Sequence, residues 1–485
     1  MIHFYKRFID ISAPMSKRYL IRTNISPFDN PTYYDAVRKN VVRSNSGNLL
    51  FPHSLIRALM TDDDTVFDPV NTHGSFSDEE IDRINASYDA FLIPLANAFR
   101  ISFMEELANL TALVRRLTIS CIVVGIGFQG NLSGDISRGF KWADTARDFC
   151  KAVLEKSAKI GLRGETTAKF MDYLGFQRDK DYQVIGCPSM FLYGADLPAP
   201  KPLSLSPDIR IHINSKVDLP QKLHDYLKGV CDAIPDHYYL PQNQYELVAM
   251  YTGIPLSYTR PDLKTMPAHY PTDPSHPLFR QNRIRGFVTV PSWLDFLRQG
   301  DLNFGTRIHG NIAAILAGIP AFIIAPDSRV LELAEYHRIP HTTVADLDEK
   351  TSVFDLLENV DFNSVLDGHK ERFETYLQFL CDNDLPSIYH AMDASAKSAN
   401  NEEDTSHSAT TNHKDDASHS ATGNRQENTP TTSTSCPFDK KISEIDFRPP
   451  LVPYRHLAAS DHFDAMRFRY TFLAKRMIKG VLRKA

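Results

Sequence analysis

The chain has 485 residues, of which 42% are hydrophobic and 23% are charged, values that fit a soluble globular protein with two or three domains. The formal net charge of −5 gives no basic excess, which argues against nucleic acid as the main partner.

Cysteine usage and apolar runs exclude several further classes. The 6 cysteines are scattered and form neither a C-x-x-C pair nor a ligand spacing with His, so no metal site and no disulfide framework is predicted. Residues 1–7 contain no long apolar run of the kind found in secretory signals. The longest apolar run, Ile312 to Ala325, contains Pro320 and is shorter than a membrane span. We therefore expect a cytoplasmic protein.

Strand and helix signals alternate in the first half of the chain. Residues 1–40 are mixed and interrupted by prolines, and we expect an N-terminal extension there. Residues 41–196 are predicted to form the first domain, because buried strands alternate with amphipathic helices as in a parallel, doubly wound sheet. The predicted strands are 90–94, 119–124, 160–163 and 183–185, and the clearest predicted helices are 143–158 and 167–174.

A second domain follows a proline-rich hinge at residues 197–207. The alternation restarts in residues 208–392, with predicted strands at 209–213 and 321–325 and predicted helices at 219–233, 291–297 and 328–337. The predicted fold class is therefore α/β, with two Rossmann-like doubly wound domains facing across a cleft that holds the ligand.

Residues 393–437 contain no Leu, Ile, Val, Met, Phe, Tyr or Trp. Such a segment buries too little apolar surface to offset the entropy of ordering, so a disordered low-complexity linker is predicted. It also contains a tandem repeat rich in Ser, Thr and His, which we interpret as a duplication in a tolerant linker rather than as a metal site.

The C-terminal residues 438–485 are predicted to form a basic amphipathic tail. From Ala465 onward there are only basic charges, and an apolar stripe lies mostly opposite them: Phe463, Met466, Tyr470, Leu473, Met477 and Val481. Such a helix can lie on an anionic membrane or dock on a protein partner, which would make the protein peripheral on the inner face of the cytoplasmic membrane. Alternatively, it packs back on its own globular part with a solvated basic face.

One segment, Gly305–Asn311, combines the features of an anion site. It precedes a helix of small and aliphatic residues that ends at Gly318, and helix N-termini attract anions. Arg307 offers a bidentate fork for carboxylate or phosphate, and His309 is the side chain that titrates near neutral pH. The alternative is that Arg307 caps another helix and His309 is a satisfied polar residue.

Several motifs in order resemble the polysaccharide pyruvyl transferase family over roughly residues 40 to 345. In the second domain they are 293–297, 305–311, 318–321, 327–329, 332–333 and 339–340; in the first they are 125–129, 162–165, 167–168, 174–175 and 186–189. The resemblance implies a fold similar to the GT-B glycosyltransferases. It also implies transfer of an enolpyruvyl group from phosphoenolpyruvate onto a sugar of a cell-surface polysaccharide, such as a capsule or exopolysaccharide, or onto its lipid-linked precursor, forming a pyruvyl ketal. Phosphoenolpyruvate is then the donor substrate, and no cofactor is expected.

The resemblance also assigns roles. Arg163 and Arg307 would clamp the anion, and His309 would act as proton donor or phosphate ligand. Asp327 and Glu332 are candidate bases or acceptor contacts, and Arg329 is a third cation; the alternative for these three is an ion-pair network that holds a helix start. The other predicted substrate contacts are Asn48, Gly127, Gln129, Ser189, Ile308, Gly310 and Asn311.

Two details limit the resemblance. Many family members carry Gly-Asn-x-Gly-Asp near the start, whereas Leu50 and Phe51 stand here where Gly and Asp would be, and Asn48 is left to take part of that role. Cys187 is interpreted as a packing residue, because the sequence shows no His or Asn constellation around it.

Two other functions stay open at this point. One is a nucleotide-sugar-dependent glycosyltransferase of GT-B type in polysaccharide biosynthesis. The other is a non-catalytic family member recruited to a biosynthetic complex through residues 438–485.

Overall fold

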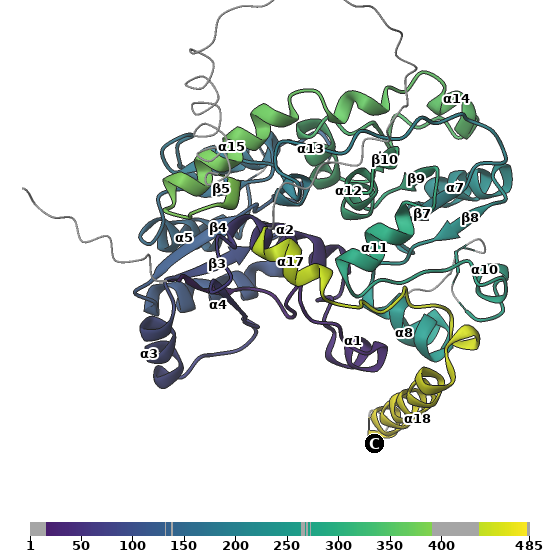
Figure 1. Cartoon of the computed structure of the whole chain (residues 1–485), viewed down its shortest axis with the longest axis horizontal. Coiled ribbons are helices and arrows are strands. Elements are labelled where there is room, and N and C mark those ends of the chain that lie inside the picture. Colours follow the sequence, from purple (N-terminus) through teal and green to yellow (C-terminus); the bar gives the residue numbers. More distant parts are fainter. Residues whose placement is uncertain are drawn as a thin grey trace, which may run out of the picture.

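The computed structural model describes residues 16–130, 132–136, 139–262, 267, 270–271, 273–389 and 436–482, the last eight of them by their backbone only. Two parallel sheets flanked by helices make up most of it (Figure 1). This arrangement confirms the predicted α/β class with two Rossmann-like units.

The first sheet has the strand order β2 (Val66–Pro69), β1 (Arg18–Ile21), β3 (Ala90–Pro94) and β4 (Ser120–Val124). A parallel pair, β5 (Ile160–Leu162) and β6 (Tyr182–Val184), adjoins it through a bridge between Ile126 and Leu162. The second sheet has the order β11 (His341–Thr343), β10 (Ala321–Ala325), β9 (Leu302–Gly305), β7 (Ile211–Asn214) and β8 (His237–Tyr239).

Helices connect the strands of each sheet. In the first half they are α1 (Tyr33–Lys39), α2 (Gly47–Leu59), α3 (Asp78–Ser87), η1 (Ile101–Phe103), α4 (Met104–Arg116), α5 (Ala143–Leu154), α6 (Glu165–Leu174) and η2 (Pro188–Phe191). In the second half they are α7 (Gln221–Ala233), α8 (Gln244–Thr252), α9 (Leu256–Thr259), α10 (Pro277–Arg280), α11 (Val290–Leu297), α12 (Ile308–Leu316), α13 (Ser328–Tyr336), α14 (Val353–Leu357), η3 (Phe362–Val365) and α15 (His369–Asp382). The C-terminal part contains α17 (Pro437–Ser443), η4 (Tyr454–His456) and α18 (Ala459–Leu482).

The strands β3 and β10 are apolar along their whole length, as is typical where helices cover both faces of a parallel sheet. Every residue of β3 and of β10 is buried. Both strands were predicted with these bounds, since a continuous apolar run of five residues is typical of a strand inside a parallel sheet.

The predicted extension at residues 1–40 is wrong from β1 onward. β1 lies between β2 and β3, so the first sheet begins before residue 41. The strand was missed because it is only four residues long and lies among polar and proline-containing segments.

The end of the second unit returns to the first. Asn383, just after α15, accepts hydrogen bonds from the backbone of Ala158 and Lys159 at 3.0 and 3.2 Å, and Lys159 pairs with Asp382 at 2.6 Å. The chain thus crosses between the two sheets a second time. The other predicted domain boundaries stay predictions.

The C-terminal segment packs on the globular part. Phe438 and Leu451 are buried, and Arg57 on α2 holds Asp439 by two bonds of 2.8 and 2.6 Å. The predicted linker at 393–437 lies outside the described residues except for Cys436 and Pro437, which begin this packed segment.

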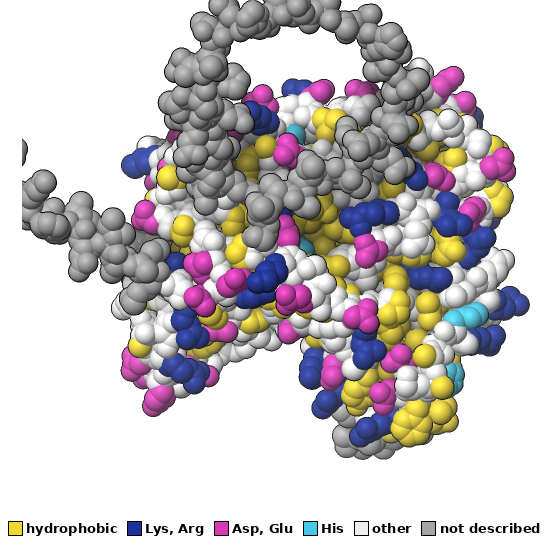
Figure 2. All heavy atoms as spheres, in the orientation of Figure 1, with side chains coloured by type: hydrophobic (Ala, Val, Ile, Leu, Met, Phe, Trp, Pro, Cys, Tyr) yellow, Lys and Arg dark blue, Asp and Glu magenta, His cyan; other side chains and the backbone are white. Residues whose placement is uncertain are grey.

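α18 packs on the globular part at some positions and leaves members of its apolar stripe exposed at others, while its docking on a membrane or a partner stays a prediction. Ala465 is buried, and the Phe468 ring lies 6.1 Å from the ring of Tyr34 on α1. Phe463 and Tyr470, members of the predicted apolar stripe, are 67% and 70% exposed. Figure 2 shows hydrophobic and basic side chains together at the surface of this part of the molecule. Within the described residues, no helix combines the length and the apolar character that a bilayer crossing requires.

Candidate functional site

A cavity of about 600 Å³ opens where the carboxyl ends of the two sheets meet. Part of its wall comes from residues within three positions of a strand end: Arg22 after β1, Asn97 after β3, Arg163 after β5, Lys216 after β7, Thr306 after β9 and Asp327 after β10. Ligands of open α/β sheets bind at this edge, so the cavity lies where the fold places a substrate. The predicted cleft is thus present.

Positive charge dominates the cavity wall. Eight of the described lining residues are cationic, namely Arg22, Lys39, Arg43, Arg100, Arg163, Lys216, Arg307 and Arg329. Among the same residues, Asp327 alone is acidic. The excess of cations suits a ligand that carries more than one negative charge.

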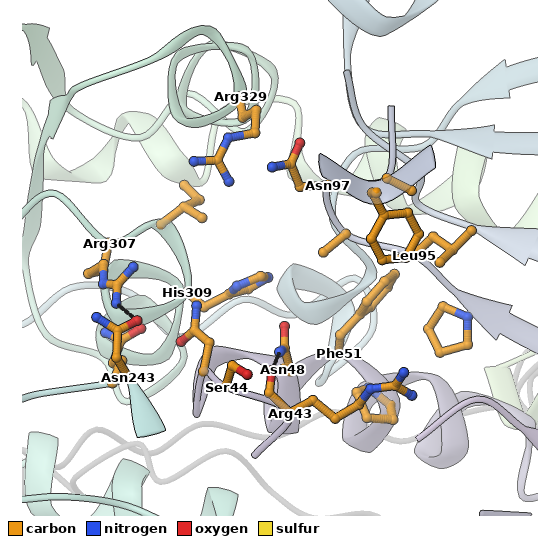
Figure 3. Close-up of a pocket in the computed structure, with 18 of the residues that line it drawn as sticks. Arg43, Ser44, Asn48, Phe51, Leu95, Asn97, Asn243, Arg307, His309 and Arg329 are labelled. Carbon is orange, nitrogen blue, oxygen red and sulfur yellow. Dashed lines mark hydrogen bonds between the residues drawn. The ribbon is translucent and has the colours of Figure 1, made fainter. Parts of the chain in front are cut away.

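Arg307 lies at the N-terminus of α12, held from both sides. Its backbone N–H donates to Asn214 Oδ1 at 2.7 Å, and its guanidinium donates to Asn243 Oδ1. Asn243 caps α8 together with Glu246, which fixes the acceptor in turn. Figure 3 shows Arg307 and Asn243 side by side at one wall of the cavity.

The turn before Arg307 requires glycine. Gly305 has a φ of +151°, and a Cβ atom there would lie 1.8 Å from the carbonyl oxygen of Asn214. This close approach lets β9 pair with β7 up to its last residue and brings Arg307 to the cavity.

Arg163 enters from the first unit. It is 4% exposed, donates from Nε to the Gly125 carbonyl at 2.8 Å, and its guanidinium lies 5.4 Å from the Phe51 ring centroid. Phe51 stands at the position where the resemblance places Asp, and its ring faces the Arg163 guanidinium. Gly127, predicted as a substrate contact, makes room for Arg163, because a Cβ there would lie 3.0 Å from Arg163 Cδ.

The arginines of the cavity are incompletely paired by the protein. Buried guanidinium nitrogens without a hydrogen-bond partner among the described residues are Arg43 Nη1, Arg100 Nε, Arg163 Nη2 and Arg307 Nε. A buried donor left unpaired costs about 1–3 kcal/mol, and more when it is charged. Four such atoms around one cavity indicate a site whose charge is complemented by an anionic ligand.

His309 lies between the arginines (Figure 3). Burial lowers its pKa well below the usual value, and the positive charges of Arg163, Arg329 and Arg307 lower the pKa further. The imidazole is therefore neutral at physiological pH. An anion beside the arginines would offset their charge and raise the pKa of His309, which links its protonation to ligand binding.

Cys187 has the histidine neighbour that the sequence did not reveal. Its Sγ lies 3.6 Å from His309 Nε2, although 122 residues separate the two in the chain. The reason given for its packing role, that no His accompanies it, is therefore wrong. The thiol is fully buried behind the imidazole, where it contacts the ring and lies away from the cavity wall.

Asp327 and Arg329 lie at the cavity wall as a pair. Asp327 caps α13 by accepting from Val330 N at 3.2 Å, and its other oxygen pairs with Arg329 at 2.6 Å. Both residues thus line the cavity, and the same contacts hold the start of α13. Their roles toward a substrate stay predictions.

Glu332 lies behind the cavity rather than in its wall. It accepts from Thr167 N at 3.0 Å and from Thr167 Oγ1 at 2.9 Å, which joins α13 of the second unit to the start of α6 in the first. These contacts favour the structural alternative for Glu332, a carboxylate that holds a helix start.

Glu332 also predicts a pH dependence of stability. Burial raises its pKa to about 7, despite the hydrogen bonds from Thr167 and the nearby arginines. The folded protein therefore keeps a proton that the unfolded chain releases near pH 4.5, so the free energy of unfolding falls between about pH 4.5 and about pH 7. Glu332→Gln should remove about 3 kcal/mol of that fall. Urea unfolding of the wild type and of Glu332→Gln between about pH 4.5 and about pH 7 measures this difference. An equal fall of the free energy of unfolding in the two proteins would contradict the raised pKa of Glu332.

The remaining predicted contacts divide into two groups. Asn48 and Ile308 line the cavity, and Asn48 donates to the Val42 and Arg43 carbonyls, which fixes the loop before α2. The described lining does not include Gln129, Ser189, Gly310 or Asn311. Asn311 is buried among other amides, donating to the Arg307 carbonyl at 2.9 Å, so it shapes the turn instead of touching a ligand.

Several cavity residues were missed by the sequence prediction. They are Arg22, Arg43, Asn97, Arg100, Lys216 and Asn243. With its amide oxygen turned toward them, Asn97 accepts from Arg100 and Arg329 at 2.7 and 3.2 Å. A search for polar residues just after each strand would have found Asn97 and Lys216, but no such signal marks Arg43.

Comparison with solved structures finds distant likenesses. The UDP-GlcNAc 2-epimerase of Methanocaldococcus jannaschii, in complex with UDP-GlcNAc and UDP, is 13% identical, with 76% of this chain and 99% of that chain covered at a TM-score of 0.40. The sucrose-phosphate synthase of Thermosynechococcus elongatus is 10% identical, with 78% and 100% covered at a TM-score of 0.40. Likenesses of this size carry no information on activity. No curated protein matches the chain.

The family model of polysaccharide pyruvyl transferases matches residues 15–328, which include β1 and end at the start of α13. The match includes Arg163, Arg307 and His309 and ends one residue before Arg329, and it begins where the first sheet begins. This chain belongs to the polysaccharide pyruvyl transferase family.

Proposed function

We propose that the protein transfers a pyruvyl group from phosphoenolpyruvate to two hydroxyl groups of a sugar, releasing phosphate and leaving a cyclic ketal. The observation that carries the proposal is the incomplete pairing of Arg163 and Arg307, whose charges both act on His309. Phosphoenolpyruvate is small and carries a carboxylate and a phosphate, so it needs several cationic donors at short range and little apolar surface.

The reaction requires balanced proton transfers. A proton adds to the methylene carbon, the oxygen of one sugar hydroxyl bonds to C2, and the oxygen of a second hydroxyl displaces phosphate from C2. The two hydroxyls release two protons. One of them balances the proton added to the methylene carbon, and the other leaves on the phosphate. In this proposal Arg163 and Arg307 hold the two anionic groups, and His309 supplies the proton to the methylene once the bound donor has raised its pKa. Asp327 faces the acceptor and takes a hydroxyl proton.

Donor identity is tested by ligand-dependent thermal stability. Phosphoenolpyruvate at saturating concentration should raise the melting temperature, because a ligand that binds only the folded state stabilises it by mass action. A nucleoside diphosphate such as UDP should do so less. Stabilisation by UDP without stabilisation by phosphoenolpyruvate would favour the glycosyltransferase alternative and overturn the proposal.

The proposal includes a place for the enzyme near lipid-linked sugars. Phe463 and Tyr470 of α18 are exposed beside the basic Arg467, as in helices that bind anionic membranes. Phe463→Ser with Tyr470→Ser should reduce co-sedimentation with vesicles containing phosphatidylglycerol at least severalfold. The matched control is Ile101→Ser, which removes an equally exposed apolar residue elsewhere. Equal sedimentation of all three proteins would exclude membrane binding through α18.

A further inference from the structure

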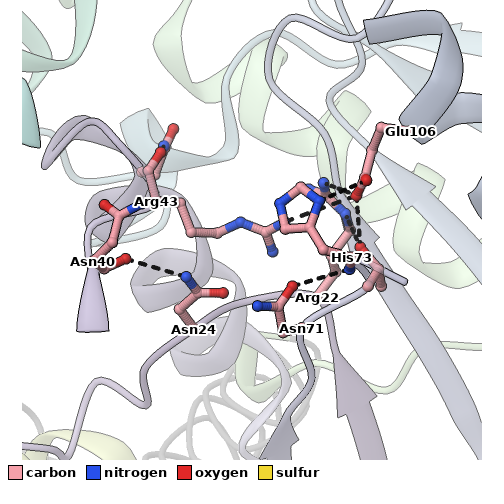
Figure 4. Close-up of polar contacts among 9 residues, drawn as sticks. Arg22, Asn24, Asn40, Arg43, Asn71, His73 and Glu106 are labelled. Atoms are coloured by element: carbon pink, nitrogen blue, oxygen red, sulfur yellow. Dashed lines mark hydrogen bonds and ion pairs between the residues drawn. The ribbon is translucent and has the colours of Figure 1, made fainter. Parts of the chain in front are cut away.

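The cavity has a second cationic end, separate from His309 and its arginines. It is formed by Arg22 and Arg43 together with His73, and Glu106 lies within ion-pair distance of all three (Figure 4). The donor chemistry proposed above uses none of these residues.

Glu106 compensates only one of the two guanidinium groups. Arg22 donates to Glu106 Oε1 at 3.1 Å and to Thr72 Oγ1 at 2.9 Å, so its charge is well paired. Arg43 lies 4.0 Å from the same oxygen, and its other acceptor is His73 Nε2 at 3.5 Å. Burial alone would raise the pKa of Glu106, but hydrogen bonds from Arg22 and Thr72 outweigh burial and the net pKa is lowered, so the carboxyl is ionised. Two cations and one anion leave a net positive charge.

Arg43 carries that uncompensated charge. Its side chain is 13% exposed, and Nη1 has no hydrogen-bond partner among the described residues. Burial and the neighbouring Arg22 lower its pKa to about 10, which still leaves it protonated at neutral pH. A cation so placed is costly unless an anion joins it.

The backbone holds Arg43 in this position. Arg43 and Ser44 both have positive φ, 46° and 69°, a conformation that costs of order 1–3 kcal/mol per residue. The loop is secured across the cleft, because Gln244 N donates to the Ser44 carbonyl at 3.1 Å and Ser46 N donates to the Gln242 carbonyl at 2.7 Å. The backbone that carries the Arg43 side chain is thus fixed by bonds across the cleft.

The space between the two cationic ends is lined by amides. The asparagines in the wall are Asn24, Asn40, Asn45, Asn48, Asn71, Asn97 and Asn243. An amide both donates and accepts, which matches sugar hydroxyl groups. The volume of about 600 Å³ is within the range of pockets that hold ligands much larger than phosphoenolpyruvate, roughly 300–1,000 Å³.

We infer that the Arg43 end binds an anionic group, phosphoryl or carboxylate, carried by the acceptor sugar itself. The asparagines then hold the sugar ring between this group and the donor at Arg307. The identification of this sugar as the acceptor rests on the proposed function. The binding of a negatively charged sugar is inferred from the Arg43 contacts alone. It names a substrate class: acidic or phosphorylated sugars rather than neutral ones.

Calorimetric binding to the full chain tests this with three probes: glucose 1-phosphate, glucuronic acid and neutral methyl glucoside. The wild-type protein should bind at least one charged probe about tenfold or more tightly than methyl glucoside, since charge-assisted hydrogen bonds are the stronger ones. Arg43→Gln should weaken the charged probe about ten- to a hundredfold and leave phosphoenolpyruvate binding within about twofold. Arg307→Gln should weaken phosphoenolpyruvate binding and leave the affinity for the charged probe within about twofold. Arg38→Gln, an exposed arginine of α1 outside the cavity, is the matched control.

Each outcome decides the matter. Arg43→Lys keeps the charge and should retain part of the affinity, which separates a lost charge from a damaged loop, and circular dichroism checks that both variants fold. Equal binding of charged and neutral probes, or charged-probe binding that Arg43→Gln leaves unchanged, would overturn the inference. If phosphoenolpyruvate fails to bind while the charged sugar depends on Arg43, the pyruvyl transfer proposal fails and the anionic sugar site stands.

Discussion

Arg307→Gln should weaken phosphoenolpyruvate binding by about 10²- to 10³-fold without unfolding the protein. A bidentate arginine–anion contact comprises two charge-assisted hydrogen bonds, each contributing about 1.5–3 kcal/mol, and glutamine retains neither the charge nor the fork. Glutamine can still donate toward Asn243, so the capped start of α8 is preserved. Titration calorimetry with phosphoenolpyruvate measures the change.

The matched control is Arg298→Gln at the end of α11. Arg298 pairs with Asp295 on the surface, about half exposed, and does not line the cavity. The Arg298→Gln variant should bind phosphoenolpyruvate with the affinity of the wild type. If Arg307→Gln bound the donor as tightly as this control, Arg307 would not belong to the donor site.

Gly305→Ala should lower the free energy of unfolding by about 3 kcal/mol or more, at the upper end of what overpacking costs. The new Cβ would lie 1.8 Å from the carbonyl oxygen of Asn214, which is backbone and cannot rotate away, and the φ of +151° is strained for alanine. β7 and β9 would have to separate at their carboxyl ends, which also displaces Arg307. The free energy of unfolding measured in urea and the affinity for phosphoenolpyruvate should therefore both fall.

Gly229→Ala in α7 provides the contrast. A Cβ there meets no atom within 4 Å, and alanine is favoured over glycine inside a helix, so this variant should be stabilised by about 0.5–1 kcal/mol. Equal stability of Gly305→Ala and the wild type would contradict the account of the turn.

Local patterns in the sequence were sufficient for most of the fold. The strands β3 and β10 and the helix α13 are marked by apolar runs or by amphipathic periodicity, both of which depend on near neighbours. β1 has neither length nor pattern. Its place in the sheet comes from pairing with β2 and β3, which lie some 50 to 70 residues further along the chain.

The residues of the candidate site likewise divide into those with a local sequence signal and those without one. Arg163, Arg307 and His309 were predicted because each belongs to a local motif at a strand end. The role of Arg43 depends on Glu106 and on backbone bonds to residues near 243, and a single sequence shows neither. Contacts of that kind decide which arginine is left unpaired, so the second cationic end became visible only in three dimensions.

The most direct test of the pyruvyl transfer proposal is incubation of the protein with phosphoenolpyruvate and a panel of glycan acceptors, both neutral and anionic. Released phosphate and the mass of the acceptor are followed together. The account predicts that phosphate is released only when an acceptor is present. One mole of phosphate should appear for each mole of acceptor that gains the mass of pyruvic acid minus water. Arg307→Gln should lose both signals. Sugar transfer from a nucleotide sugar, with no ketal formed from phosphoenolpyruvate on any acceptor, would contradict it.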